Sequence, residues 1–297
     1  MKFEMKNHLK PCAALSAAII VIALVLTMMG MGMNLGIDFT GGTLMTYNMG
    51  ADFNADDVAA ALAECGVADA QIAKTGEDNT QVQIRIKDVE NTDDLRTQLE
   101  EKLSASYPAI EYVDITRVGA VVGAELISNA IKSLTLAAVL MLCYIAVRFD
   151  LYSGIAAVIG LCHDIAIMLS FVVILSSFIR VETTFIAALL TIVGYSINNT
   201  IIIFDRIREN SHKVGVRQLP REQIVNISVT ESLPRTINTT ITTLLTIVTL
   251  YVLGVDSIKQ FALPLIIGIV AGTYSANMIN GYVWALLVDK STKRKKA

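Results

Sequence analysis

The sequence predicts an α-helical polytopic membrane protein, with six transmembrane helices and a small extracytoplasmic α+β domain between the first two. Two observations lead to this prediction. First, 54% of the 297 residues are apolar and only 17% are charged, which is below the usual quarter for soluble domains. Second, long uncharged runs such as 183–204 and 236–255 recur along the chain. Each is long enough to cross about 30 Å of hydrocarbon as a helix.

The charges divide the chain into the parts that this fold requires. Residues 34–125 hold 17 acidic and 6 basic residues, whereas the rest of the chain holds 10 acidic and 18 basic residues. We therefore expect an acidic soluble block after the first span. The expected organisation is a cytoplasmic N-terminus at 1–11, a first transmembrane helix at 12–34, an α+β domain at 35–125, five further transmembrane helices at 126–288 and a basic cytoplasmic tail at 289–297.

The first apolar run contains 27 uncharged residues, at 11–37. A cleaved signal peptide has an apolar core of only about 7–15 residues, so we expect an uncleaved anchor helix. The later spans are expected near 126–147, 153–179, 184–204, 237–254 and 260–288.

The acidic block alternates between strand and helix patterns. Strands are expected at 43–49, 69–74, 81–86 and 111–118, with helices opened by Asn54 and by Thr92. Within 81–86, Val82, Ile84 and Ile86 alternate with polar residues, which is typical of a half-buried sheet. The order βαββαβ predicts a ferredoxin-like domain.

Basic residues indicate the orientation of the spans. With the N-terminus in the cytoplasm, fourteen lysines and arginines lie on the cytoplasmic side, and only Arg180 and Lys259 lie in short outer loops. This bias predicts a multi-pass protein with both termini cytoplasmic and the acidic block outside.

Ionisable and amide residues at membrane depth are costly, so each is a candidate for function. In the third span, Asp164 lies well inside the apolar run 151–179. We expect it to have a functional or network role that the adjacent His163 supports. The fourth span carries a polar stripe toward the cytoplasmic end: Thr191, Tyr195, Asn198 and Asp205, with Asn199 beside it and Gly194 admitting a neighbouring helix.

The fifth span begins at a guanidinium and continues as a row of hydroxyls. Arg235, Thr239 and Thr242 recur on one helical face. In the sixth span, Gly268 and Gly272 form a GxxxG pattern, for which packing is the favoured interpretation. Simpler interpretations remain open, because Arg235 can extend to the headgroups and threonines can bond to their own helix. Asp205 can likewise pair with a neighbouring arginine at the interface.

The sequence does not indicate an enzyme. It contains no nucleophile and base pair, no cluster of metal ligands and no nucleotide-binding loop, so neither a cofactor nor a metal is expected. Nucleic acid is a poor fit, because the basic run 206–221 is short and lies against the membrane.

Four motifs resemble the SecD/SecF family of protein-export subunits. The segment after the first span contains Gly36, Asp38, Gly41 and Gly42 in a GxDFxGGT pattern. Segments 193–210, 234–243 and 272–275 are similar to the motifs of the fourth, fifth and sixth spans. The resemblance covers nearly the whole chain, and it is closer to SecF than to SecD, which would carry a much larger outer region.

The resemblance implies half of an RND-superfamily transporter in the bacterial cytoplasmic (inner) membrane. A SecD-like subunit would be an obligate partner. Together the two would assist the SecYEG channel and the SecA ATPase in moving a preprotein, using the proton motive force, or sodium in some lineages. Two alternatives stay open: an RND-type efflux half-transporter, and a scaffold that assembles the Sec complex without coupling.

One position departs from the family pattern. The family carries an aspartate, its proton-carrying acid, where this chain has Asn199. An amide does not exchange a proton near physiological pH. Either the partner's acid performs the coupling, or Asp164 substitutes, or the ion is not a proton.

Overall fold

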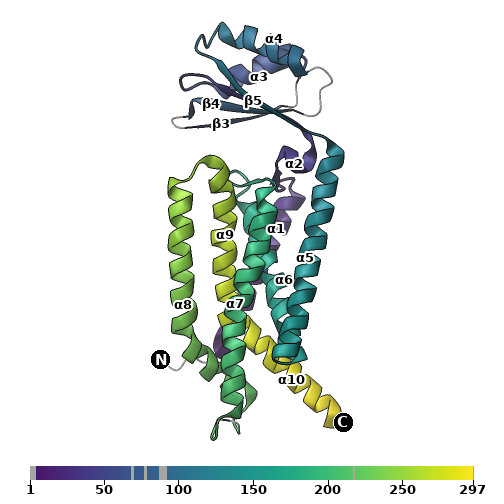
Figure 1. Ribbon diagram of the computed structural model, residues 1–297, viewed down its shortest axis with the longest axis vertical. Helices are drawn as coiled ribbons and strands as arrows, with labels where there is room; N and C mark the ends of the chain where they lie inside the picture. Colours follow the sequence, from purple (N-terminus) through teal and green to yellow (C-terminus); the bar gives the residue numbers. More distant parts are fainter. Residues whose placement is uncertain (1–4, 68–69, 77–78, 87–91, 217, 297) are drawn as a thin grey trace. The chain divides into compact units, whose positions relative to one another are not determined.

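The computed structural model describes residues 5–67, 70–76, 79–86, 92–216 and 218–296. The chain divides into two compact units (Figure 1). Residues 35–130 form the α+β unit, and residues 1–34 with 131–297 form the helical unit. The fold class predicted from the sequence is confirmed, because the described residues include six helices that are long and apolar enough to cross a membrane, and a small sheet domain follows the first of them.

The α+β unit contains a four-stranded sheet with two helices. Its elements are β2 (Gly42–Asn48), α3 (Ala55–Glu64), β3 (Gln71–Thr75), β4 (Gln81–Ile86), α4 (Thr92–Ser104) and β5 (Glu111–Val118). The strand order is β3-β4-β2-β5, and each neighbouring pair is antiparallel. Figure 1 shows α3 and α4 on one face of the sheet. This is the predicted ferredoxin-like arrangement.

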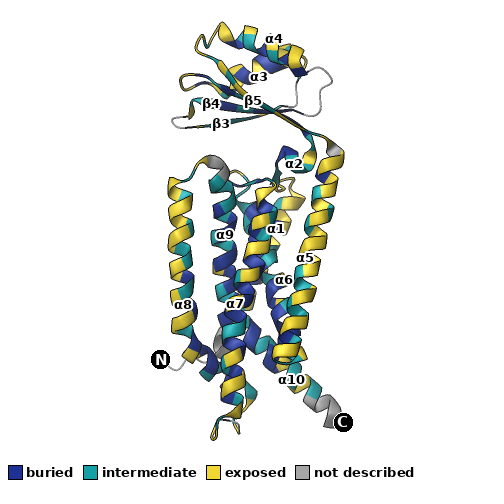
Figure 2. Cartoon of the chain, in the orientation of Figure 1, coloured by how far each residue is buried: buried dark blue, intermediate teal, exposed yellow. Residues whose placement is uncertain are grey.

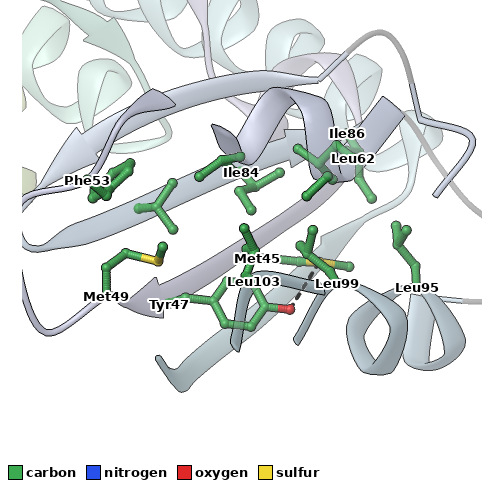
Figure 3. Packing of buried hydrophobic residues seen from close by; sticks show 13 residues of the cluster. Met45, Tyr47, Met49, Phe53, Leu62, Ile84, Ile86, Leu95, Leu99 and Leu103 are labelled. Carbon is green, nitrogen blue, oxygen red and sulfur yellow. Dashed lines mark hydrogen bonds between the residues drawn. The ribbon is translucent and has the colours of Figure 1, made fainter. Parts of the chain in front are cut away.

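The core of this unit is apolar and lies between the sheet and its two helices (Figure 3). Val82 and Ile84 have no exposed surface, as their alternation with polar residues predicts. The Tyr47 hydroxyl lies 3.8 Å from the Met45 sulfur, which gives this buried phenol a partner inside the core.

A short segment precedes the sheet. It contains β1 (Asn34–Leu35) and the one-turn helix α2 (Ile37–Thr40). Gly41 ends α2 with a φ of 70°, a left-handed value that glycine adopts without steric cost. A Cβ on Gly123, in the first turns of α5, would lie 2.5 Å from the Phe39 carbonyl oxygen. The glycine thus lets α5 approach α2 closely.

The spanning helices begin and end as follows: α1 (Met5–Met28), α5 (Ala120–Arg148), α6 (Leu151–Ile174), α7 (Thr184–His212), α8 (Arg221–Leu253) and α9 (Asp256–Ser275), which continues through the π-helix η2 (Ala276–Asn280) into α10 (Gly281–Lys296). The two-residue strand β6 (Arg180–Val181) lies between α6 and α7. The π-helix interrupts what the sequence predicts as a continuous last span.

Burial differs among these helices (Figure 2). In α6, α7 and the last span, 44–56% of the most apolar window is buried, whereas in α1, α5 and α8 the share is 6–11%. The first group therefore forms the centre of the helical unit. Its helices approach closely at glycines, since a Cβ on Gly272 of α9 would lie 3.0 Å from the Ser196 Cβ of α7.

Candidate functional site: a polar network among the membrane helices

Asp164 of α6 lies at the centre of the helical unit and has no exposed surface. The Ser196 hydroxyl of α7 donates to its Oδ2 at 2.5 Å. The His163 Nδ1 lies 3.0 Å from its Oδ1. A buried charge requires a partner and hydrogen bonds, and Asp164 has both oxygens engaged. The prediction that Asp164 belongs to a network has this geometric support.

His163 connects Asp164 to the first helix. Its Nε2 lies 2.8 Å from the Ser16 hydroxyl oxygen of α1. The ring also lies 6.0 Å, between centroids, from the ring of Tyr274 in α9. Three other helices, α1, α7 and α9, therefore meet the histidine and aspartate pair of α6.

Asn199 lies in a second cluster, where α7, α8 and α9 meet. Its side chain has no exposed surface, and its Nδ2 donates to the Thr273 hydroxyl at 3.2 Å. Thr273 lies 2.8 Å from the Thr240 hydroxyl, which also accepts from the Tyr195 hydroxyl at 3.2 Å. No donor in the described ranges reaches the Asn199 Oδ1, so the amide oxygen is a buried acceptor without a hydrogen bond.

A third group of contacts joins the π-helix to α7. Asn280 donates to the Thr200 hydroxyl at 2.8 Å, and Thr200 donates to the Ser196 carbonyl at 3.0 Å. Gly160 of α6 leaves room for Asn280, because a Cβ there would overlap the amide group. The Thr236 hydroxyl similarly donates to Asn277 at 3.0 Å. The π-helix thus carries two amides that bond to neighbouring helices, and π-bulges are frequent at functional sites.

Other predicted residues lie on the outside of the helical unit. Asn198, Asp205 and Arg235 are exposed. Asp205 lies 3.7 Å from the Arg148 guanidinium, and Arg235 forms no ion pair with any carboxylate among the described residues. The Thr239 and Thr242 hydroxyls donate to carbonyls of their own helix, three and four residues earlier.

The glycines predicted to be important differ in their surroundings. Gly268 and Gly272 face α7, where added Cβ atoms would meet Ile192 and Ser196. Gly194 is exposed, and nothing lies within 4 Å of a Cβ built on it. Gly36 is the N-cap of α2 and Asp38 lies within α2, both in the α+β unit.

Several members of the network are not among the residues that the sequence singled out as coupling candidates. They are Ser16, Ser196, Thr200 and Thr240. Serines and threonines are common in membrane helices and usually bond to their own backbone. Only the position of Ser196, one turn before Asn199, offers a signal in the sequence.

Asp164 is the one fully buried carboxylate of this network among the described residues, and its remaining partners are hydroxyls, amides and an imidazole. Among the described residues, no group of three or more His, Cys, Asp or Glu side chains could hold a metal ion. A single buried acid beside an imidazole is suited to proton exchange.

Comparisons with known proteins place the chain in a family. The family model described as "Protein export membrane protein SecD/SecF, C-terminal" matches residues 98–290, and the model of the SecD/SecF GG motif matches residues 28–51. The chain belongs to the SecD/SecF family. The resemblance stated from the sequence motifs is thereby confirmed.

Named relatives are of the SecF type. The "Protein translocase subunit SecF" of Thermobaculum terrenum is 34% identical over 277 residues, which are 88% of this chain and 87% of the relative. That of Gemmatimonas aurantiaca is 36% identical over 309 residues, 99% of this chain and 91% of the relative.

A solved structure of SecDF from Thermus, described as a translocon-associated membrane protein, is 32% identical with a TM-score of 0.80. The alignment covers 98% of this chain but only 39% of that one. The chain therefore corresponds to the SecF-type portion of a SecDF protein, and it spans about two fifths of the fused chain.

Proposed function

We propose that this chain is a SecF-type subunit that assists preprotein translocation across the bacterial cytoplasmic membrane, using an ion gradient. The observation that carries the proposal is the SecF-type family membership together with a fully buried carboxylate in a polar network. The family match also makes the efflux alternative unnecessary. The alternative of a scaffold without coupling is favoured by Asn199, an amide where the family has its acid, and the experiment below tests it.

A SecD-like subunit is the proposed obligate partner. Thr191, Asn198, Arg235 and Thr242 are exposed on α7 and α8, and polar groups that face lipid are costly. A second half of the transporter would cover this row. The fused SecDF chains, of which this chain matches 39–40%, have the length for such a half. The SecYEG channel, SecA and the preprotein are proposed partners of the assembled complex.

The charge distribution supports the proposed orientation. Fourteen basic residues lie on one side of the spans and two lie in the short loops on the other. The positive-inside rule then places both termini in the cytoplasm and the α+β unit on the outer side, where an emerging preprotein would be bound and released.

Asp164 is the proposed coupling acid of this subunit. Asn199 is buried beside Thr273 but has no proton to exchange. Asp205 is exposed and lies 3.7 Å from the Arg148 guanidinium. Among the described carboxylates, Asp164 alone combines full burial with an adjacent imidazole. A change in its charge would alter the hydrogen bonds that hold α1, α6 and α7 together.

The test is preprotein translocation in vesicles that contain this chain with its SecD-like partner, SecYEG and SecA, under an imposed proton or sodium gradient. Asp164→Asn is expected to abolish the stimulation by the gradient, whereas Asp205→Asn is expected to retain most of it. Ser170→Ala is the matched control, because Ser170 is buried on the same helix and bonds only to the Ala166 carbonyl.

Membrane abundance and copurification with the partner are measured for each variant. The proposal of coupling at Asp164 is wrong if Asp164→Asn responds to the gradient like wild type while Asp205→Asn does not. If Asp164→Asn, Asp205→Asn and Asn199→Asp all leave the gradient response unchanged, the result would instead favour the scaffold.

A further inference from the structure

Three hydrogen bonds connect α1 to α7 through two adjacent side chains of α6. The Ser16 oxygen lies 2.8 Å from His163 Nε2, and His163 Nδ1 lies 3.0 Å from an Asp164 oxygen. The other Asp164 oxygen accepts from Ser196. Ser16 is only 6% exposed. Both ring nitrogens of His163 therefore have a partner, one on each side of the ring.

The protonation state of the ring determines the direction of the bond to Ser16. In a neutral ring that donates from Nδ1 to an ionised Asp164, Nε2 has a lone pair and accepts from the Ser16 hydroxyl. When a proton binds at Nε2, this nitrogen becomes a donor and the Ser16 oxygen accepts. The same hydroxyl is then a donor in one state and an acceptor in the other.

Few other titratable groups lie near this pair. Helix α6 packs against α1, α7, α9, η2 and α10. Tyr274 of α9 lies beside the His163 ring, and Cys12 of α1 lies beside Tyr274. From α7, the facing group is the Ser196 hydroxyl. No lysine, arginine or second carboxylate of the described residues forms an ion pair with His163 or Asp164.

We propose that His163 is the site of proton uptake in this subunit, that it titrates together with Asp164 as one unit, and that Ser16 transmits the charge of this unit to α1. The inference rests on the proposed function, in which Asp164 couples the ion gradient to export. It goes further by naming the atom that receives the proton and the helix that responds.

The proton balance is simple. Before uptake, Asp164 is ionised and His163 is neutral, so the pair has a charge of −1. One proton from water binds at Nε2, and the pair becomes neutral overall as an imidazolium and a carboxylate, or as a neutral imidazole and an acid once the shared proton moves to Asp164. Release at Nε2 reverses the step. No bond other than N–H or O–H changes.

The α1 end of the network is not an ordinary helical serine. Hydroxyls in helices usually donate to a carbonyl one turn earlier, as Ser170 does to Ala166 at 2.7 Å. When the ring becomes a donor, the Ser16 hydroxyl hydrogen is free to make this backbone bond. Before proton uptake, Ser16 of α1 donates its hydrogen bond to His163 of α6. After uptake, Ser16 accepts a hydrogen bond from His163 instead.

The experiment uses the full chain with its SecD-like partner in bilayers, with ¹⁵N-labelled histidine. The chain has three histidines, His8, His163 and His212, and His163→Gln assigns the signal of interest. Nitrogen shifts distinguish a ring protonated at Nδ1, at Nε2 or at both. The His163 signal is expected to change from Nδ1–H to the doubly protonated or Nε2–H form as the pH falls. It is also expected to lose its preference for Nδ1–H in Asp164→Asn.

Ser16→Ala removes the contact to α1 and leaves the pair intact. We expect its His163 signal still to change with pH while gradient-stimulated translocation is lost, with Ser170→Ala unaffected in both measurements. A His163 signal that keeps one form at every pH would overturn the uptake site, even if translocation in wild type depends on the gradient. Full gradient stimulation in Ser16→Ala would overturn transmission through α1. Wild-type translocation that ignores the gradient would instead overturn the proposed function.

Discussion

The two units of this chain both have an apolar core, but they differ in the polar groups that they bury. The α+β unit packs an apolar core and carries its ion pairs on the surface, such as Lys102 with Glu64 at 2.5 Å. The helical unit buries Asp164, Asn199 and Asn280, and exposes large apolar side chains such as Leu136, which is 59% exposed. The difference follows from the solvent, because water drives apolar groups inward and lipid does not.

The two units also differ in the residues that make their packing specific. In the α+β unit, the pattern of apolar residues determines the fold. In the helical unit, apolar residues are present on every side, and polar contacts across helices, such as that between Ser196 and Asp164, add to the apolar packing where the buried faces meet. Each substitution below alters one of the two units and leaves the other unchanged.

The largest effect is expected in the apolar core. Leu99→Ala should lower the free energy of unfolding of the α+β unit by about 2–5 kcal/mol, because Leu99 has no exposed surface and its loss leaves a cavity. The measurement is denaturant unfolding, followed by hydrogen exchange of the β4 amides. Leu136→Ala in α5 is the control and should change stability little. Equal losses in both variants would contradict the comparison.

A smaller loss is expected where the polar network is tightly packed. Gly160→Ala should destabilise the helical unit by about 1–3 kcal/mol, since the new Cβ would overlap the Asn280 amide. Thermal unfolding in detergent measures this loss. Gly194→Ala adds the same methyl group in open space and should leave stability unchanged or slightly raise it. The packing argument is wrong if both glycines tolerate alanine equally.

A substitution in the exposed polar row of α7 and α8, which contains Arg235, should affect function without affecting stability. Arg235→Lys keeps the charge but loses the planar group that can bond to a carboxylate at two points. We expect the variant to copurify with the SecD-like partner but to lose export stimulation. Full activity would show that Arg235 only extends to the headgroups. Arg208→Lys, also exposed on the helical unit, is the control.

The smallest effect is expected at the surface ion pair. The hydrogen bond from Lys102 holds the pKa of Glu64 below its usual value, and the bond to Glu64 raises the pKa of Lys102. The contribution of the pair is therefore present between the two ordinary values, about 4.3 and 10.4. It is lost as the pH falls through the lowered value or rises through the raised one.

Glu64→Gln should accordingly flatten the pH dependence of unfolding of the α+β unit slightly at both ends. Both groups are exposed to water and salt, so the change is small. Glu101→Gln, on the exposed side of α4, is the control. Unfolding curves that are the same for wild type and Glu64→Gln at every pH would show that the pair contributes nothing.

The sequence predicts the α+β unit almost element by element. Val82, Ile84 and Ile86 alternate along β4, and Asn54 accepts from the Asp56 N–H at the start of α3. These signals are local, so a single sequence contains them. The Gly41 turn is predicted for the same reason, because its φ of 70° requires the residue type that stands there.

The polar network is predicted only in part, for a physical reason. Periodicity places Asn198 and Asp205 on one face of α7, but it does not say that the neighbouring helices pack against the adjoining face, where Ser196 and Asn199 lie. The contact between Ser16 and His163 joins residues 147 positions apart. Such pairings depend on how the helices assemble, which no local pattern encodes.

The π-helix η2 has a consequence for the length of the last span. A π-helix accommodates extra residues within an otherwise α-helical segment, so α9 and α10 are joined by a built-in change of register. Deleting one residue from the first turn of α10, at 281–284, would leave η2 in place and rotate the rest of α10 by about 100° relative to α9. Asp289, which lies 3.2 Å from Arg221 of α8, would turn away from that arginine. The chain length of this span is therefore under as strict a constraint as its composition.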